Sequence, residues 1–476
     1  MYLDIAVVVA YSSAMLLVGW RARRQSGESY WVADRKYGTS RVSASLLITV
    51  FGATATMGVV SLGYERGLTG VWYPLTGAVA LVPFGFFLAG RVRDLGVHTL
   101  PDILQRAYGN DVSVPAALLI AISWCGVIAA QMLAGASLLS GVFPVSFVPA
   151  LGVVAVVFVI YTFWGGQLSV VRTDFWQLFL FLGGLLICAN ILLADTVGSG
   201  LSIRGAVPDG HLSFPVSEQF GWYELLVYYP LVVGLPFLVG PDLFSRVFCA
   251  KDGATARRSA FIAAAAIVPI AFLLASLGLL IRALFPEIPP DTALPTALDS
   301  ALPAGLKGIA VAAFLAAIMS SADTTLVTAS TILSLNVIAP TRRKTESQRL
   351  WLTRASLIVL GICSWLVAGF VGGIIPALLL GFTIYIGGLV VPTLASFFRE
   401  RIGVTANGAK WAVIVGGTTA LLGGIDNGSL LRALVGVRGN ELLQMLLGPS
   451  YPSILPLTLS LILILAVSKL SSGKNG

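Results

Sequence analysis

The chain has 476 residues, of which 57% are hydrophobic and only 11% are charged, and its mean hydropathy is +0.90. Soluble domains carry about 25% charged residues, so these values exclude a soluble protein and place the chain in a lipid bilayer. The formal net charge of +8 would suggest nucleic-acid binding in a soluble protein. Here the basic residues gather in loops between apolar runs, and no nucleic-acid partner is expected.

About thirteen apolar runs are long enough to cross roughly 30 Å of hydrocarbon, which takes about 20 helical residues. They lie at 3–20, 43–64, 71–90, 112–141, 146–163, 174–194, 222–245, 259–281, 305–338, 350–370, 374–397, 409–424 and 453–469. No long polar segment remains to form a soluble domain. The sequence therefore predicts one all-α integral membrane domain over residues 1–476.

The distribution of basic residues predicts how this domain lies in the membrane. If the loops alternate between the two sides, all but six of the thirty Lys and Arg fall on one side. Loops rich in Lys and Arg stay in the cytoplasm, so the N-terminus is expected outside and the C-terminus inside a multi-pass protein of the cytoplasmic (plasma) membrane. The first run lacks a basic start and is expected to be a retained N-terminal helix, not a cleaved signal.

Two of the predicted spans contain residues that weaken a helix. The second span carries Gly52 and Gly58 among β-branched neighbours, and the seventh carries Pro230, Gly234, Pro236, Gly240 and Pro241. Each opens a set of five spans, at 41–194 and 222–397. Broken helices at corresponding positions indicate a five-plus-five inverted repeat with a binding site near the bilayer midplane. The alternative is that Gly and Pro kink these helices without function.

The span 305–338 carries hydroxyls and an acid in the stretch "AAIMSSADTTLVTAS". Ser320, Thr324 and Thr328 share one helical face, and Asp323 would cost about 2.5–3.5 kcal/mol at the bilayer centre unless something offsets it. Hydroxyl and carbonyl oxygens suit a metal cation, and sodium fits them better than a proton does. A proton would need Asp323 or Asp174 as its carrier, and that alternative stays open, as does packing for the hydroxyls.

The other polar candidates are weaker. Asp174 begins the sixth predicted span, where it is either a second ion ligand or a solvated helix-start residue. Gln131 is the lone amide of the run 112–141, with Trp124 about two turns before it, and it either lines a solute pocket or bonds to a neighbouring helix.

Cofactors and covalent chemistry are not expected. The four cysteines lie in or beside the spans, so no disulfide framework is indicated. The only two histidines, His98 and His211, fall in predicted loops, which argues against haem held between two spans. The spans offer no nucleophile–base pair and no cluster of metal ligands, so no enzyme is predicted. The loop 282–304 is rich in proline and is expected to resist regular helix.

Four ordered motifs resemble those of the sodium:solute symporter family. They are "YTFWGGQLSVVRTDFWQ" from Tyr161 to Gln177, "VGPDLFSRVFCAKD", "GYERGLTGVW" and "AAIMSSADTTLVTASTILSLNVI". The resemblance covers nearly the whole chain. It implies the five-plus-five inverted repeat with one additional N-terminal helix at 3–20 and two additional C-terminal helices within 409–469.

The resemblance also implies positions for ions and solute. The main sodium site would use main-chain oxygens of Ile48, Phe51 and Ala317 and the hydroxyls of Ser320 and Ser321. A possible second sodium site would use Asp174, Ser320, Asp323 and Thr324. The solute pocket would include Ala53, Thr54, Gln131, Val233 and Thr383.

These features predict a secondary active transporter that couples sodium to the symport of a small organic solute by alternating access. The solute would be an amino acid, sugar, carboxylate or vitamin, and sodium would be the coupling ion, with no other cofactor. Proton-coupled symport is one alternative. A solute-sensing membrane protein that signals through a separate partner is another.

Overall fold

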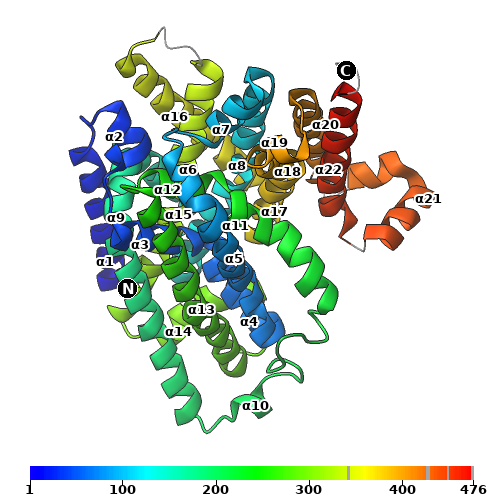
Figure 1. The fold of residues 1–476 in the computed structure, drawn as a ribbon. Coiled ribbons are helices and arrows are strands. Elements are labelled where there is room, and N and C mark those ends of the chain that lie inside the picture. The colour runs from blue at the N-terminus through cyan, green and yellow to red at the C-terminus, as the bar shows by residue number, and fades with distance from the viewer. Residues whose placement is uncertain (340–343, 425–428, 448–449, 473–476) are drawn as a thin grey trace.

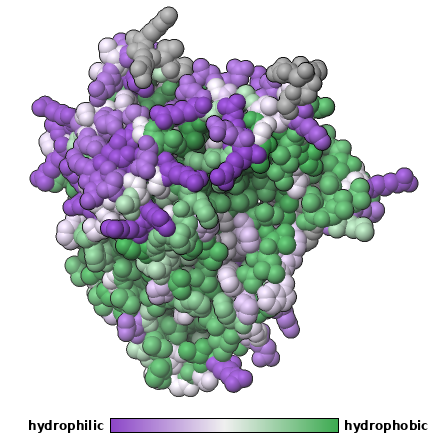
Figure 2. Space-filling model, in the orientation of Figure 1, coloured by the Kyte–Doolittle hydropathy of each residue, from purple (hydrophilic) through white to green (hydrophobic). Residues whose placement is uncertain are grey.

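The computed structural model describes residues 1–339, 344–424, 429–447 and 450–472. Over these ranges the secondary structure is helical, and the only β-type pairing consists of two isolated bridges, Tyr37 with Ala250 and Ser217 with Phe220. Figure 1 shows the helices gathered into one bundle, with α21 standing away from it. In Figure 2 hydrophobic surface covers the middle of the bundle, and hydrophilic side chains gather at the end where α2, α7 and α16 lie.

The helices of the first half of the chain are α1 (Tyr2–Arg21), α2 (Gly27–Val32), α3 (Thr39–Val50), α4 (Val59–Arg66), α5 (Trp72–Pro83), α6 (Ala89–Asp94), α7 (Leu100–Tyr108), α8 (Asn110–Val142), α9 (Phe147–Gly198) and α10 (Ile203–Ala206). The second half contributes α11 (Leu235–Val239), α12 (Pro241–Phe248), α13 (Gly253–Leu284), α14 (Ala293–Ala301), α15 (Leu306–Ile332), α16 (Glu346–Phe370), α17 (Ile374–Tyr385), α18 (Val391–Ser396), α19 (Arg399–Ile402), α20 (Ala406–Gly424), α21 (Ser429–Leu447) and α22 (Tyr451–Ser472). Short 3-10 and π segments, η1 to η9, lie between some of them. The prediction that 282–304 resists helix is wrong at α14, which begins after the prolines at 289 and 290.

Ten helical stretches in the described ranges are long and apolar enough to cross a membrane. Two of them are long enough for two crossings of about 20 residues each: the stretch at 54–94 has 41 residues and α9 has 52. The first covers half of the predicted span 43–64 and all of 71–90, and α9 covers nearly all of 146–163 and all of 174–194. The predicted span 409–424 falls in α20, which is not among the ten. The all-helical membrane architecture is confirmed, while the count of thirteen crossings and the orientation stay predictions.

The helix α15 forms the centre of the bundle. In its most apolar stretch 94% of the residues are buried, against 17% for α1, 28% for α22 and 33% for α16. It packs against α9, α8, α1 and α3. The hydroxyl-rich stretch of the sequence therefore lies inside protein, and the helices around it present their apolar side chains to lipid.

Three of the membrane helices are broken. The second predicted span leaves helical geometry at Phe51 (φ −85°, ψ 46°), after α3 and before the π segment η2 (Thr54–Gly58). The seventh span is interrupted at Gly240, whose backbone is extended (φ −63°, ψ 135°) between α11 and α12. The interruptions predicted in these two spans are confirmed. In α9, Gly166 adopts φ 53°, ψ −167° inside the helical element, where a residue with a Cβ would be strained and would meet the ring of Tyr30 at 2.5 Å.

Candidate functional site

The break after α3 is held open by side chains from two neighbouring helices. In an unbroken helix the N–H of Ala53 would donate to the carbonyl of Thr49. Here the Ala53 N–H donates to Gln131 Oε1 on α8 at 2.7 Å, and the Thr49 carbonyl accepts the hydroxyl of Ser321 on α15 at 2.7 Å. Because these two side chains replace one helical hydrogen bond, the Ala53 N–H and the Thr49 carbonyl are both satisfied inside the membrane.

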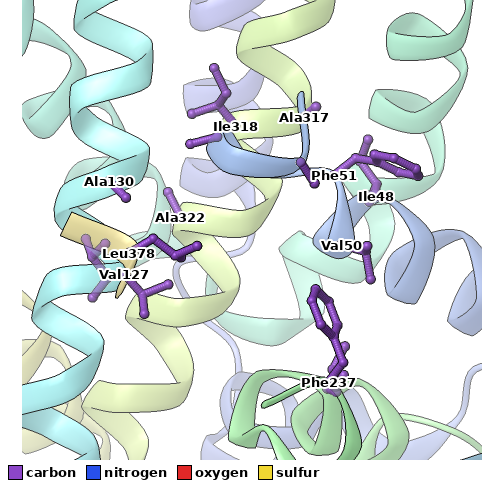
Figure 3. Close-up of a cluster of buried hydrophobic side chains, with 14 of the residues drawn as sticks. Ile48, Val50, Phe51, Val127, Ala130, Phe237, Ala317, Ile318, Ala322 and Leu378 are labelled. Atoms are coloured by element: carbon purple, nitrogen blue, oxygen red, sulfur yellow. The ribbon is translucent and has the colours of Figure 1, made fainter. Parts of the chain in front are cut away.

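Close packing at Gly52 fits this arrangement. A Cβ added there would lie 2.6 Å from the Ser321 oxygen and 2.8 Å from Gln131 Oε1. Figure 3 places Ala317 of α15 beside the broken end of α3 near Phe51. The structure thus brings Ala317 and Ser321 of the predicted main site to the predicted break, although the carbonyl that Ser321 contacts belongs to Thr49 and not to Ile48 or Phe51.

A second cluster lies around Asp174, which is fully buried. Its carboxylate accepts hydrogen bonds from Ser320 at 2.6 Å and from Ser45, and it forms an ion pair with Arg246 at 3.3 Å in which both side chains are fully buried. The alternative of a solvated helix-start residue is therefore wrong for Asp174. The residue lies within α9, eight positions after the break at Gly166.

Arg246 of α12 connects four elements. Its Nε donates to Thr49 of α3 at 3.2 Å, its Nη1 donates to Gln167 of α9 at 2.5 Å, and its Nη2 donates to Thr324 of α15. Together with the ion pair to Asp174, these contacts engage all three guanidinium nitrogens. Buried charges of this kind persist only when they are paired and hydrogen-bonded.

The four residues of the predicted second ion site are not all brought together. Asp174 and Ser320 are in contact, and Thr324 joins them through Arg246. Asp323 instead accepts a hydrogen bond from Thr162 at 2.7 Å through Oδ1, and its buried Oδ2 has no hydrogen-bond partner among the described residues. Asp323 is therefore a separate acidic position on the face of α15 toward α9.

A small cavity lies at the break, and η2, α8, α12 and α17 all contribute to its wall. Its volume of about 40 Å³ gives room for only a few water molecules. Of the predicted solute residues, Thr54 and Gln131 line it and Ala53 adjoins it through its bond to Gln131. Val233 is buried in η6 (Pro230–Gly234) but is not a lining residue, and the Thr383 hydroxyl lies 3.5 Å from Ser453 of α22.

The sequence model of the sodium:solute symporter family matches residues 30–416, which is most of the chain. The chain belongs to the sodium:solute symporter family. Its curated relatives include the human sodium/glucose cotransporter 4, which is 24% identical over 88% of this chain and 68% of its own length. The Drosophila melanogaster high-affinity choline transporter 1 is 27% identical over 76% of this chain and 61% of its own length. The Vibrio parahaemolyticus sodium/glucose cotransporter is 24% identical over 78% and 76%.

Solved structures support the same fold. A sodium-coupled sialic acid symporter in a substrate-bound outward-open state aligns with a TM-score of 0.78 and 17% identity, over 99% of this chain and 98% of that one. A nucleobase-cation-symport-1 family transporter in a closed conformation aligns with a TM-score of 0.60 and 14% identity, over 93% and 95%. At these identities the likeness concerns the fold alone, and it agrees with membership of a symporter family.

The sequence did not predict a role for two charged residues of the site, Arg246 and Asp242. Arg246 was counted with the charges of a cytoplasmic loop, but it is fully buried. Asp242, one turn earlier, lines the cavity and was given no role. The signal that could have found both is their position directly after the Gly240–Pro241 interruption, at the end of a predicted span, where a broken helix turns polar groups inward.

Proposed function

We propose that this chain couples sodium entry to the symport of a small organic solute by alternating access in the plasma membrane. Membership of the sodium:solute symporter family supports secondary active symport. The observation that carries the proposal is the break at Thr49–Ala53, where freed backbone groups of one helix face the hydroxyl of Ser321 on its neighbour. Main-chain oxygens and hydroxyls are hard ligands of the kind that an alkali cation requires.

The main sodium site, in this proposal, uses main-chain oxygens of Ile48, Phe51 and Ala317 and the hydroxyls of Ser320 and Ser321. Each serine hydroxyl donates its proton elsewhere, Ser320 to Asp174 and Ser321 to the Thr49 carbonyl. A hydroxyl has two lone pairs besides its proton, so both oxygens keep lone pairs for a cation. This supports a site in which the serines are oriented before the ion arrives.

The charge of Arg246 argues against a sodium ion at the second predicted position. Its guanidinium lies 3.3 Å from the Asp174 carboxylate, so it already supplies the positive charge at this acid. A sodium ion would bind Asp174, Ser320 and Thr324 only after Arg246 moved away, because two cations at one carboxylate repel. We therefore propose that one sodium ion, at the main site, is bound while Arg246 pairs with Asp174.

The architecture proposed for this function is the five-plus-five inverted repeat, with thirteen crossings, repeats at 41–194 and 222–397, and additional helices at 3–20 and within 409–469. The interruptions at Phe51 and Gly240 each lie in the first helix of one set, as an inverted repeat with a midplane site requires. Sodium entry down a membrane potential supplies about 2.3 kcal/mol per charge per 100 mV. By linkage, sodium binding then raises solute affinity and solute binding raises sodium affinity.

Proton coupling is the second candidate, and Asp323 is the observation in its favour. Its buried Oδ2 has no partner in the described part of the chain, and such an oxygen needs a proton or a cation. Uptake into vesicles driven by a sodium gradient at constant pH, compared with uptake driven by a pH gradient without sodium, separates the two candidates.

The test of the sodium site uses three serine variants of α15. Ser320→Ala and Ser321→Ala are expected to raise the sodium concentration for half-maximal uptake by at least about tenfold, because each removes a cation ligand. Ser330→Ala is the matched control, since this buried hydroxyl donates only to the Val327 carbonyl of its own helix. Sodium dependence that is unchanged in both site variants, at equal protein level, would remove this site from the proposal.

A further inference from the structure

The cavity beside the broken helix is lined by one carboxylate side chain, Asp242. This residue lies in the first turn of α12, is partly exposed and lines the cavity. The lining includes no Lys, Arg or His. Within the described ranges Asp242 takes part in no ion pair. The cavity therefore presents a carboxylate without a cationic partner.

The basic residue one turn along α12 does not neutralise this carboxylate. Arg246 is paired with Asp174 at 3.3 Å, and its three nitrogens also donate to Gln167, Thr49 and Thr324. The Arg246–Asp174 pair is neutral as a unit, so Asp242 adds a net negative charge to the region. A carboxylate kept unpaired beside a cavity inside the membrane is costly, and a cationic ligand would offset that cost.

The rest of the cavity wall is rich in aromatic rings. Tyr73, Trp124, Phe237 and Phe382 all line it. Trp124 is held edge-on against Tyr385, with ring centroids 4.9 Å apart at 70°, and its buried indole N–H has no hydrogen-bond partner among the described residues. Aromatic faces attract ammonium groups, and methylated ammonium groups most characteristically, and a free indole N–H can donate to a hydroxyl oxygen of a ligand.

We propose that the solute is a small organic cation carrying an ammonium or methylated ammonium group, which pairs with Asp242 and lies against the four aromatic rings. The cavity of about 40 Å³ is too small for such an ion, so binding requires the surrounding helices to move apart. This inference rests on the proposed function and names the class of its solute. A zwitterion would bring a carboxylate for which the cavity lining offers no basic residue. A sugar would leave Asp242 without a counter-charge.

The first test needs no variant. The purified full-length chain in sodium buffer is titrated with choline and with 3,3-dimethyl-1-butanol, which has the same shape without the charge, and the thermal unfolding midpoint is followed. Glucose and proline serve as a neutral and a zwitterionic probe. Choline is expected to bind at least about tenfold more tightly than its uncharged analogue. Equal binding of the pair, or stabilisation by glucose or proline and not by choline, would overturn the inference.

The second test removes the charge. Asp242→Asn is expected to weaken choline binding by at least about tenfold, and Asp299→Asn, an exposed position paired with Lys307, is the control that should leave it unchanged. If Asp242→Asn instead changed only the sodium requirement, Asp242 would be an ion ligand and the inference would be wrong. A different result would refute the proposed function alone. If choline bound and entered vesicles equally well in sodium and in potassium, sodium coupling would be refuted and the solute class would still be supported.

Discussion

Removing Arg246 while leaving Asp174 in place is expected to destabilise the fold more than any other single change in this region. The two charged groups lie 3.3 Å apart and are fully buried. Two unit charges at this distance attract by about 5 kcal/mol at an effective dielectric constant of about 20. Measured costs of removing one partner of a buried pair are about 3–5 kcal/mol. We therefore expect Arg246→Met to lower the free energy of unfolding by about 3–5 kcal/mol.

The reverse change should cost less, for a reason visible in the contacts. Without the Asp174 charge, Arg246 still donates to Thr49, Gln167 and Thr324. Without Arg246, Asp174 keeps only the hydroxyls of Ser45 and Ser320. Asp174→Asn is therefore expected to be the milder single variant. The double variant should be more stable than Arg246→Met alone, because replacing both members of a buried pair removes the uncompensated charge.

Equilibrium unfolding in mixed micelles, followed by tryptophan fluorescence, measures all four proteins of this double-variant cycle. The coupling energy is the difference between the double variant and the sum of the two single variants. Two results together would refute the reasoning: a cost for Arg246→Met below about 1 kcal/mol, and a double variant whose loss equals that sum. They would mean that water or another group compensates Asp174, and the argument for one sodium ion would lose its basis.

Two further predictions concern the break and the polar end of the bundle. Gly52→Ala should abolish sodium-dependent uptake, because its Cβ would lie 2.6 Å from the Ser321 oxygen, whereas Gly183→Ala, with open space around it, should be neutral in the same uptake assay. Burial raises the pKa of Glu28, but the hydrogen bonds and charges of His98, 2.7 Å away, and Arg35, 3.0 Å away, together outweigh it and leave that pKa below its ordinary value of 4.5. Because the pKa of Glu28 is lower in the folded than in the unfolded chain, the ionised side chain stabilises the fold at pH values above the unfolded pKa. This stabilisation is lost as the pH falls through the folded pKa. Glu28→Gln should therefore flatten the decline of the melting temperature between about pH 5 and 3.

The broken helices were predictable because their cause is local. Gly52, and the Gly240–Pro241 pair, weaken a helix wherever they occur, and the structure interrupts both spans at or next to these residues. The apolar runs were predictable for the same reason, since each must cross the bilayer by itself. What local sequence did not reveal is that 146–163 and 174–194 would form one helical element, α9, with its backbone departing from helical geometry at Gly166.

The partners of the polar side chains were less predictable, because packing decides them. Ser320 and Ser321 are adjacent in sequence, yet one donates to Asp174 of α9 and the other to Thr49 of α3. The α15 hydroxyl face predicts that a polar partner exists but not which helix supplies it. Arg246 shows the difficulty most clearly: an arginine followed closely by other basic residues looks like part of a cytoplasmic loop, and only the approach of α12 to α9 reveals it as the partner of Asp174.

The short helix α12 connects the two parts of the candidate site. Asp242 lines the cavity, and Arg246, one turn along the same helix, contacts Thr49 beside the break and Thr324 on α15. A solute that draws Asp242 inward must therefore either move Arg246 with it or strain these hydrogen bonds. Thr49 contacts both Arg246, through its hydroxyl, and Ser321, through its carbonyl. A movement of Arg246 would therefore be transmitted through Thr49 to Ser321, one of the proposed sodium ligands. Coupling by this route requires that Arg246→Lys, which keeps the charge and loses the fork, weaken the dependence of solute affinity on sodium more than it weakens solute binding itself.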